Sequence, residues 1–326
     1  MIGRLTRYLE GVLGRYNRPH AAPGAKRQVV RARYDAAQTT DENRRHWAMA
    51  DGLGADQANS AQVRRTIRNR ARYEAGNNGF AAGICHTLAN DTVGTGPRLQ
   101  LTRIGGNEAR LVERLFAEWA EAIGLADKLR VMRFARAVDG EVFGLLHSNR
   151  HLAVPVQLDL RPIEADLIGS PGIEWPSVNT VDGIVLSDDG IPLAYQLLRQ
   201  WPGEAASAQL IPAAAMVHAL VTTRPGQHRG VSEFTPTLHI FAMLRRYTQA
   251  VLAAAETAAD FAAVLYTDAP AGGEADAVEP MDRLPIDKRS MTTMPAGWKV
   301  EQFHPEQPTS NHEQFLHANL VEAARP

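Results

Sequence analysis

The sequence has one cysteine, few aromatic residues and no long uncharged apolar run. Cys85 alone cannot form an internal disulfide or a multi-cysteine metal site, which favours a reducing cytosol. The most apolar stretch, residues 250–266, contains Glu256 and Asp260, whose charges are costly in lipid, so no membrane span is predicted. The basic N-terminus lacks the apolar block of a secretory signal. We therefore expect a protein that stays inside the cell that makes it.

The motifs of the common nucleotide, metal and hydrolase sites are also missing. No glycine-rich loop ends in Gly-Lys-Ser or Gly-Lys-Thr, which excludes a P-loop ATPase. Gly94-Thr95-Gly96 lacks the third glycine of a dinucleotide loop and follows a predicted helix, so these glycines are expected to shape a turn. The histidines lack ligand spacing, and no Gly-x-Ser-x-Gly string occurs. We expect no catalytic residue, no cofactor and no metal.

Two pairs of carboxylates are the nearest approach to catalytic chemistry. Asp139 with Glu141, and Glu164 with Asp166, are spaced two apart on predicted strands, so that each pair faces one way. Such pairs can perform acid–base chemistry or bind a divalent metal. At the rim of a sheet they are more often solvated or paired with arginine, which is the interpretation we favour.

The chain of 326 residues is 44% hydrophobic, which is enough to bury one large core or two modest ones and excludes a disordered protein. The net charge of -1 argues against a protein whose whole surface is basic and binds nucleic acid. Locally the charge is uneven, because residues 1–75 contain 15 basic and 7 acidic side chains. The front of the chain is basic and the rest is acidic.

The pattern of apolar residues and turn signals predicts a mixture of helices and strands. Helices are predicted at 42–50, 62–75, 80–91, 107–123 with a continuation over 124–136, and from 311 onward. Strands are predicted at 98–103, 138–147, 154–166, 184–186 and 298–303. The longest helix is predicted over 235–264, after Thr235-Pro236, because threonine caps a helix and proline is tolerated in its first turn.

The predicted helix at 62–75 contains the densest positive charge of the chain. Arg64, Arg68 and Arg72 share one face at a spacing of four, and Arg65 lies beside them. This stripe is suited to a subunit interface or to phosphate contacts. The alternatives are a solvated face and a face paired within the chain that includes Glu74.

Six strings, taken in order, resemble the lambda-type family of tailed-phage portal proteins. They are Ala32-Arg33-Tyr34-Asp35-Ala36-Ala37, His46-Trp47-Ala48, residues 63–74 followed by Asn77-Asn78, Val93-Gly94-Thr95-Gly96-Pro97-Arg98-Leu99, Asp139-Gly140-Glu141-Val142-Phe143, and Arg224-Pro225-Gly226-Gln227 with Arg229-Gly230-Val231-Ser232. Each string alone is weak. Their shared order makes the resemblance specific.

The resemblance implies a subunit of a ring, usually a dodecamer, at one capsid vertex of a tailed phage or prophage. Its partners would be other copies of itself, the terminase large subunit, head-completion or connector proteins, and capsid or scaffold proteins. Double-stranded DNA would pass non-specifically through the channel during packaging and ejection. Such a protein is not an enzyme and does not bind a membrane; it is located in the virion and assembled in the bacterial host cytoplasm.

The resemblance also implies an α+β portal fold with a mixed α/β wing region, a long stem-type helix and a partial tunnel-loop and helix region. In this scheme residues 1–30 are a basic flexible arm, 31–230 the wing-like region, 231–266 the stem-type helix, 267–290 an acidic linker or clip-side loop, and 291–326 a strand, a tunnel-type loop and a C-terminally truncated helix. The candidate tunnel-loop residues are His304, Pro305, Gln307, Pro308 and Ser310.

Two alternatives belong to other functional classes. A phage-encoded metal-dependent nuclease or hydrolase would use the paired carboxylates, and a monomeric nucleic-acid-binding module would use the arginine stripe. Ring formation distinguishes the portal hypothesis from both.

Overall fold

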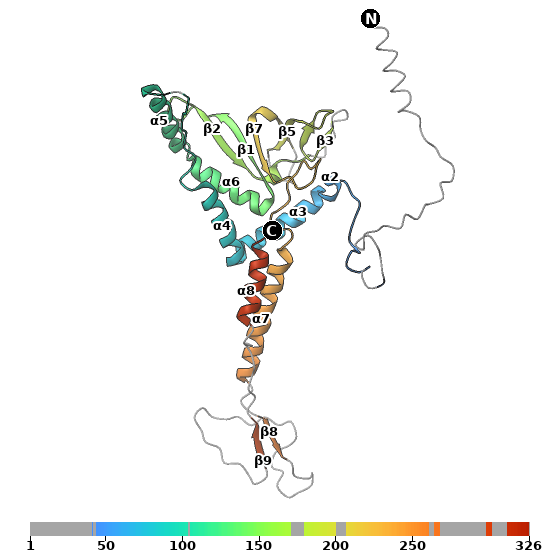
Figure 1. The fold of residues 1–326 in the computed structure, drawn as a ribbon. Coiled ribbons are helices and arrows are strands. Elements are labelled where there is room, and N and C mark those ends of the chain that lie inside the picture. Colours follow the sequence, from blue (N-terminus) through green and yellow to red (C-terminus); the bar gives the residue numbers. More distant parts are fainter. Residues whose placement is uncertain are drawn as a thin grey trace, which may run out of the picture. The chain divides into compact units, whose positions relative to one another are not determined.

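Figure 1 shows the fold in a computed structural model of the chain. The structure describes residues 41, 44–103, 105–170, 179–199, 207–260, 264–267, 298–301 and 312–325. The chain divides into two compact units, residues 1–52 and 53–326. The first motif string, the basic arm, residues 268–290 of the acidic linker and the candidate tunnel-loop residues 304–310 lie outside the described residues.

In the first unit the predicted helix at 42–50 is wrong, because residues 44–49 form turns. All of these residues are exposed. A helix of this length is marginal in water unless it packs an apolar face against a neighbour.

Helices dominate the first half of the second unit. They are α2 (Ala55–Ala58), α3 (Ala61–Asn77), α4 (Gly79–Val93), α5 (Asn107–Ala122) and α6 (Leu125–Asp139). The predictions for α3, α4, α5 and α6 are confirmed to within a few residues. Asn78 separates α3 from α4, and its side chain accepts a hydrogen bond from the Phe80 backbone N–H at 3.0 Å, which caps α4.

Two antiparallel sheets follow. The first has the order β2-β1-β7 and consists of β1 (Glu141–Ser148), β2 (Leu158–Ile163) and β7 (Met216–Leu220). The second has the order β3-β4-β5-β6 and consists of β3 (Thr180–Val181), β4 (Ile184–Leu186), β5 (Pro192–Leu198) and β6 (Ala208–Pro212). Short 3₁₀ turns, η2 (Ala165–Leu167) and η3 (Ala213–Ala215), follow β2 and β6.

The predicted strand at 98–103 is wrong. The described residues of this segment form no ladder, and the Leu101 backbone N–H instead donates to Glu113 Oε1 on α5 at 2.8 Å. Alternation of apolar residues predicts a strand only where a partner strand is available, and here a side chain satisfies the backbone donor.

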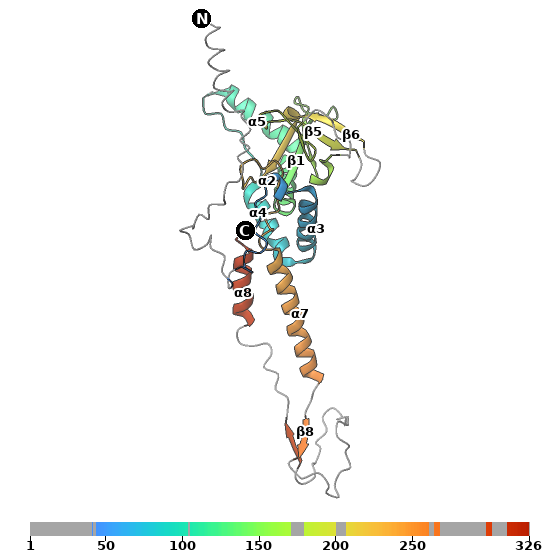
Figure 2. The same cartoon turned by 90° about the vertical axis from the view of Figure 1, so that its right-hand side faces the viewer.

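The longest helix in the described part of the chain is α7 (Leu238–Asp260), at 23 residues. Its predicted end at Val264 is wrong, because β8 (Val264–Thr267) pairs antiparallel with β9 (Trp298–Glu301). The final helix, α8 (His312–Ala323), lies beside α7 in Figures 1 and 2. His312 Nδ1 lies 3.0 Å from the Tyr247 hydroxyl, and the Tyr247 and Phe315 rings are 4.7 Å apart, which holds the two helices together.

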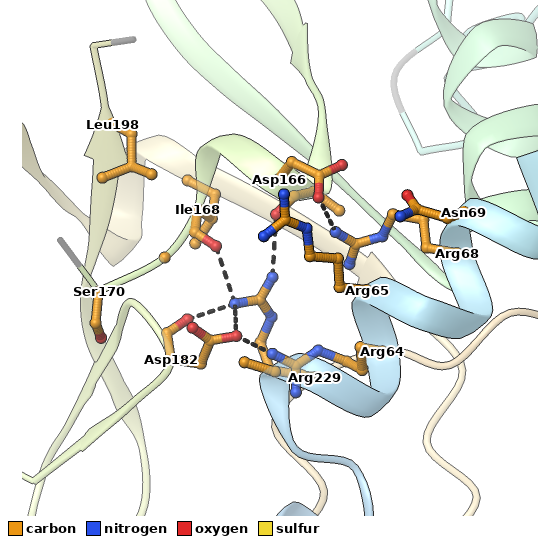
Figure 3. A pocket seen from close by; sticks show the side chains of 13 residues that line it. Arg64, Arg65, Arg68, Asn69, Asp166, Ile168, Ser170, Asp182, Leu198 and Arg229 are labelled. Carbon is orange, nitrogen blue, oxygen red and sulfur yellow. Dashed lines mark hydrogen bonds and ion pairs between the residues drawn. The ribbon is translucent and has the colours of Figure 1, made fainter. Parts of the chain in front are cut away.

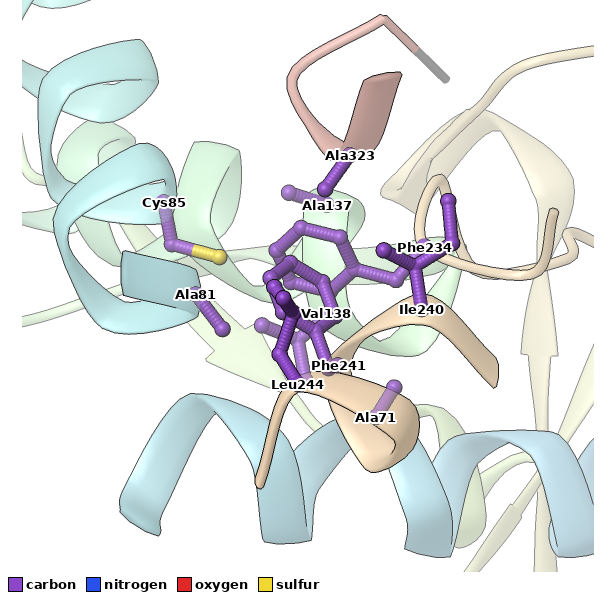
Figure 4. Packing of buried hydrophobic residues seen from close by; sticks show 10 residues of the cluster. All are labelled: Ala71, Ala81, Cys85, Ala137, Val138, Phe234, Ile240, Phe241, Leu244 and Ala323. Carbon is purple, nitrogen blue, oxygen red and sulfur yellow. The ribbon is translucent and has the colours of Figure 1, made fainter. Parts of the chain in front are cut away.

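The helical core is built largely from small residues. Its buried members come from five helices and the segment before α7: Ala71, Ala81, Cys85, Ala137, Val138, Phe234, Ile240, Phe241, Leu244 and Ala323 (Figure 4). Alanines let the helix backbones approach closely, while Phe234 and Phe241, whose rings are 5.6 Å apart, fill the centre. Burial raises the pKa of the Cys85 thiol to about 12, which makes it an inert core residue.

Two further clusters support the sheets. One lies around Phe143, Ile168 and Tyr195 and joins the two sheets, and the other packs Met132 of α6 against Val142 and Leu160. Among the described residues no helix is both long and apolar enough to cross a bilayer.

Candidate functional site

Three segments that the sequence singled out meet at one buried place: the arginine face of α3, the corner between α6 and β1, and residues 229–232. We call the resulting set of ion pairs the arginine network. It comprises Arg64, Arg68, Arg72 and Arg229 with Asp139, Glu141, Asp166 and Asp182. Figure 3 shows part of it from close by.

Glu141 and Arg229 form the centre of the arginine network. Glu141 is fully buried and Arg229 is 1% exposed. Arg229 Nη2 donates to Glu141 Oε1 at 2.7 Å, and the Gly230 backbone N–H donates to Oε2 at 2.8 Å. His218 Nε2 lies 3.1 Å from the same Oε2. Burial alone would raise the pKa of Glu141, but the Arg229 charge and the hydrogen bonds from His218 and Arg229 outweigh it, so the pKa lies well below its ordinary value.

The remaining donors of Arg229 bind backbone carbonyls. Its Nη1 donates to Ile168 O at 3.0 Å and its Nη2 to Ala165 O at 3.2 Å. A third bond reaches the carbonyl of Asp182 in the turn between β3 and β4. One guanidinium therefore joins β1, the η2 segment and the second sheet, which explains why so large a polar group is tolerated in the interior.

The arginine stripe on α3 is directed inward at three of its four positions. Arg64, which is 5% exposed, pairs with Asp182, and Arg68, which is 4% exposed, donates to Asp166 at 2.8 Å and to Glu141 at 3.2 Å. Arg72 makes a bidentate pair with Asp139 at 2.8 and 2.7 Å. Burial lowers the pKa of Arg72, but the hydrogen bonds that it donates to Asp139 and the charges of nearby carboxylates raise the pKa above its ordinary value.

Three arginines of the stripe, Arg64, Arg68 and Arg72, are therefore paired within the chain, which is one of the alternatives given above. The same alternative includes Glu74, which is buried and pairs with Arg245 of α7. Arg65 is different, because it is exposed and, among the described residues, has no ion pair or hydrogen bond. Of the four candidate contacts for a neighbouring subunit or for phosphate, Arg65 is the one whose guanidinium has no ion pair or hydrogen bond with another described residue.

Glycines allow the segments of the arginine network to touch. Gly140 has φ 87°, and a Cβ built on it would lie 2.1 Å from the carbonyl carbon of Val231. A Cβ on Gly230 would lie 2.2 Å from the Gly140 carbonyl oxygen. Both positions require glycine, so the strings that contain Gly140 and Gly230 encode one close backbone crossing.

The string at 224–227 forms the turn that leads into this crossing. Gln227 Oε1 accepts hydrogen bonds from the Thr223 and Arg224 backbone N–H groups at 3.0 and 3.3 Å, and its Nε2 donates to Arg229 O at 2.8 Å. Asn59 Nδ2 also donates to Arg229 O at 2.8 Å. The turn is thereby fixed to the start of α3.

A second group of ion pairs holds the entrance of α7. Glu233 accepts from Arg133 at 3.2 and 3.1 Å and from Arg136 at 3.3 Å, both on α6. Ser232 Oγ donates to Ala137 O at 3.2 Å. The chain therefore enters α7 from a fixed position on the end of α6.

Of the four paired carboxylates only Glu141 lies on a strand, so the predicted placement of both pairs on strands is wrong. Asp139 is the last residue of α6, Glu141 the first of β1, and Asp166 lies in η2, because the chain turns sharply at Gly140 and again after β2. Asp139, Glu141 and Asp166 each bind arginine, and Glu164 is exposed. In the described part of the chain no group of three or more His, Cys, Asp or Glu side chains is placed to hold a metal ion.

Sequence reasoning missed several partners in the arginine network. Asp182 is not among the candidate residues of the sequence analysis, although it has φ 39° and pairs with two arginines. Asn59 and His218 gave no signal. Partners separated by a hundred residues or more along the chain leave no local pattern.

The sequence matches the phage portal protein, lambda family, over residues 41–325. The chain belongs to this family. Its fold is similar to that of a chain in a structure described as the neck of an empty gene transfer agent (GTA) particle computed with C6 symmetry, with a TM-score of 0.50 and 12% identity. The similarity covers 78% of this chain and 66% of that chain. A chain in the virion of a native GTA particle gives a TM-score of 0.48 at 12% identity, over 78% of this chain and 66% of that one.

No curated protein matches the sequence. The match to the portal family includes every residue of the arginine network. Three of the strings on which the resemblance was based, at 63–74, 139–143 and 229–232, supply residues of the network. In this portal-family chain the described parts of these strings contribute to the packing and ion pairs that hold the fold together.

Proposed function

We propose that the protein is a portal subunit, which forms a ring at one capsid vertex through which double-stranded DNA is packaged and ejected. The observation that carries the proposal is the family match over residues 41–325. It is supported by the fold likeness to a neck structure computed with C6 symmetry. The proposed ring is a dodecamer. Terminase would dock on it during packaging and head-completion proteins would dock later, and the assembled ring would be part of the virion.

The proposal assigns the regions of the chain as follows. The helices and sheets before residue 230 form the wing-like region, and α7 is the stem-type helix. The hairpin of β8 and β9 at the far end of α7 belongs to the clip side. The order of the elements supports this assignment of regions. A 23-residue helix is followed by a short antiparallel pair of strands and then by a helix that packs on α7.

Negative-stain imaging of the purified chain over a range of concentrations tests the proposal. We expect rings with a central hole. Discrete monomers at every concentration would contradict the portal assignment, and monomers that cleave DNA in the presence of a divalent metal would favour the nuclease alternative. We expect no cleavage, because the buried carboxylates that such a reaction needs are bound to arginines.

DNA binding gives a second test. A channel through which a polyanion slides cannot hold it tightly, since each neutralised phosphate adds affinity and therefore friction. We predict weak, sequence-independent binding of duplex DNA that falls steeply with added salt. This is measured by fluorescence anisotropy with two unrelated duplexes in a salt series. Tight, sequence-selective binding at physiological salt would indicate a regulator instead.

A further inference from the structure

A groove of about 550 Å³ lies between α3 and the start of α7. Its apolar lining residues are Ile67, Tyr73, Leu238 and Ala242. Tyr73 is 55% exposed, and Met243, which follows Ala242 on α7, is 51% exposed. Exposed apolar side chains gathered in this way are typical of a surface that a partner covers. We use the name α3–α7 face for Ile67, Arg70, Tyr73, Ala242, Met243 and Arg246.

The α3–α7 face is basic. Among the side chains described, the charged residues that α3 and α7 expose are Arg65, Arg70, Arg246 and Glu256. The carboxylate that lines the groove, Glu74, is buried and paired with Arg245. Arg70 lies at the groove, and Arg246 lies one turn after Ala242 on the same side of α7. Neither arginine has an ion pair or hydrogen bond with another described residue.

The other side of the helical core is acidic. In Figures 1 and 2, α4 and α8 lie on one side of this core, and α3 and α7 lie on the other. The charged residues that α4, α8 and the two residues after α8 expose are Asp91, Glu313, Glu322 and Arg325. Phe80 is 58% exposed and Val321 is 39% exposed. We use the name α4–α8 face for Phe80, Asp91, Glu313, Val321 and Glu322.

The two faces lie at the same level along α7. α8 packs beside the first half of α7, because His312 contacts Tyr247 and Ala323 lies in the core with Ile240. The groove is lined by residues of the same half of α7. A rotation about an axis parallel to α7 does not shift a subunit along that helix, so it can bring these faces together. The exposed apolar edge of α5 lies at the other end of α6 (Figure 1).

We propose that the α3–α7 face of one subunit binds the α4–α8 face of its neighbour. The inference rests on the ring of the proposed function. A cyclic ring joins identical subunits head to tail, so each subunit needs two different and complementary surfaces. In this chain an apolar groove with a basic rim is matched by exposed apolar side chains among carboxylates. Val321 would enter the groove, and Glu313 and Glu322 would face Arg70 and Arg246.

Reversal of the charges on each face tests the proposal. The first variant is Arg70→Glu with Arg246→Glu, and the second is Glu313→Arg with Glu322→Arg. All four side chains are exposed and have no ion pair or hydrogen bond with another described residue, so both variants should fold, which circular dichroism checks. Sedimentation velocity over a concentration series measures assembly. Each variant alone should raise the concentration needed for half-assembly by about tenfold or more, because like charges then meet.

An equimolar mixture of the two variants should assemble again, because every contact then joins opposite charges. A chain with all four reversals should assemble for the same reason. The matched control is Arg110→Glu with Arg161→Glu, which reverses two exposed arginines outside both faces and should leave assembly unchanged. The proposal is overturned if neither variant weakens assembly, if the control weakens it equally, or if the mixture assembles no better than each variant alone.

Cross-linking separates this inference from the portal assignment. A chain with Ala242→Cys is mixed with a chain with Val321→Cys and treated with a short bis-maleimide, to which the buried native Cys85 is inert. Cross-linked dimers without rings would support the contact between the two faces and contradict the portal ring. Rings that give no more cross-link than a control pair with Ala117→Cys of α5 would support the portal ring and overturn this interface.

Discussion

Glu141 occupies the corner between α6 and β1, with two arginines, a histidine and a backbone N–H around its two oxygens. Four donors on one fully buried carboxylate are more than charge neutralisation needs. They fix the positions of β1, β7 and residues 229–230 relative to one another. The residue has the burial and the charge partners that are often found at active sites, but here every oxygen is occupied by a structural contact.

Glu141→Gln is expected to destabilise the fold by about 3–5 kcal/mol, because it removes the fully buried carboxylate that pairs with both Arg229 and Arg68. Urea denaturation followed by circular dichroism measures the loss. Glu164→Gln is the control, since Glu164 is exposed, and it should change the free energy of unfolding by less than about 0.5 kcal/mol. Equal stability of the two variants would contradict the central role of Glu141.

The pH dependence follows from the same residue. The pKa of Glu141 is lower in the folded state than in the unfolded state, so its contribution is fully present above the unfolded value of about 4.3 and is lost as the pH falls towards the folded value. The stability difference between the wild type and Glu141→Gln should therefore stay constant from neutral pH down to about 4.3 and shrink below it. Denaturant titrations at a series of pH values measure this difference. A difference that grows in acid would have the wrong sign.

At the scale of elements, the sharpest constraint is the crossing between the end of α6 and the entrance of α7. The helix ends because Gly140 adopts a left-handed conformation, and Ser232 and Glu233 then bind the last turn of α6. The same few residues therefore end α6, begin β1 and direct the chain into α7. The positions at which α6 ends and α7 begins therefore depend more on contacts between these segments than on the helix propensity of their residues.

Gly140→Ala is expected to destabilise the protein by about 1–3 kcal/mol or more, because the added Cβ needs a strained φ and meets the Val231 backbone at 2.1 Å. Gly76→Ala is the matched control. Gly76 lies within α3 with nothing within 4 Å of its missing Cβ, so alanine there should stabilise the helix by up to about 1 kcal/mol. Thermal unfolding of both variants measures the two effects, and a neutral Gly140→Ala would rule out the close crossing.

At the scale of the whole molecule, the arginine stripe divides into two functions. Arg64, Arg68 and Arg72 hold α3 against the sheets, while Arg65 remains available at the surface. Reversing Arg64 or Arg68 therefore tests folding, whereas reversing Arg65 tests assembly or ligand binding. In a ring, identical subunits meet through two different surfaces, and only if Arg65 lies in one of them would it face an acidic partner on the neighbour.

Arg68→Glu is expected to prevent stable folding, because it places a third carboxylate beside Glu141 and Asp166 in the interior. Arg65→Glu is expected to leave the free energy of unfolding within about 0.5 kcal/mol of the wild type. Circular dichroism and imaging of the same preparations separate folding from ring formation. A soluble, native-like Arg68→Glu protein would show that the internal pairs are dispensable.

The sequence by itself determined the helices α3 to α6, because their apolar spacing is a local pattern. It also determined the family, because the motif strings are recognised from their order along the chain and no knowledge of contacts is needed. It also identified the arginines and carboxylates that carry the densest charge. Only the tertiary structure decided which of them pair, since Arg64 and Asp182 are 118 residues apart and Arg229 and Glu141 are 88 apart. Ion pairing depends on distance in space and on exclusion of water, neither of which has a period along the chain. For the same reason a locally plausible strand at 98–103 did not form, because strand formation requires a partner that only the fold supplies.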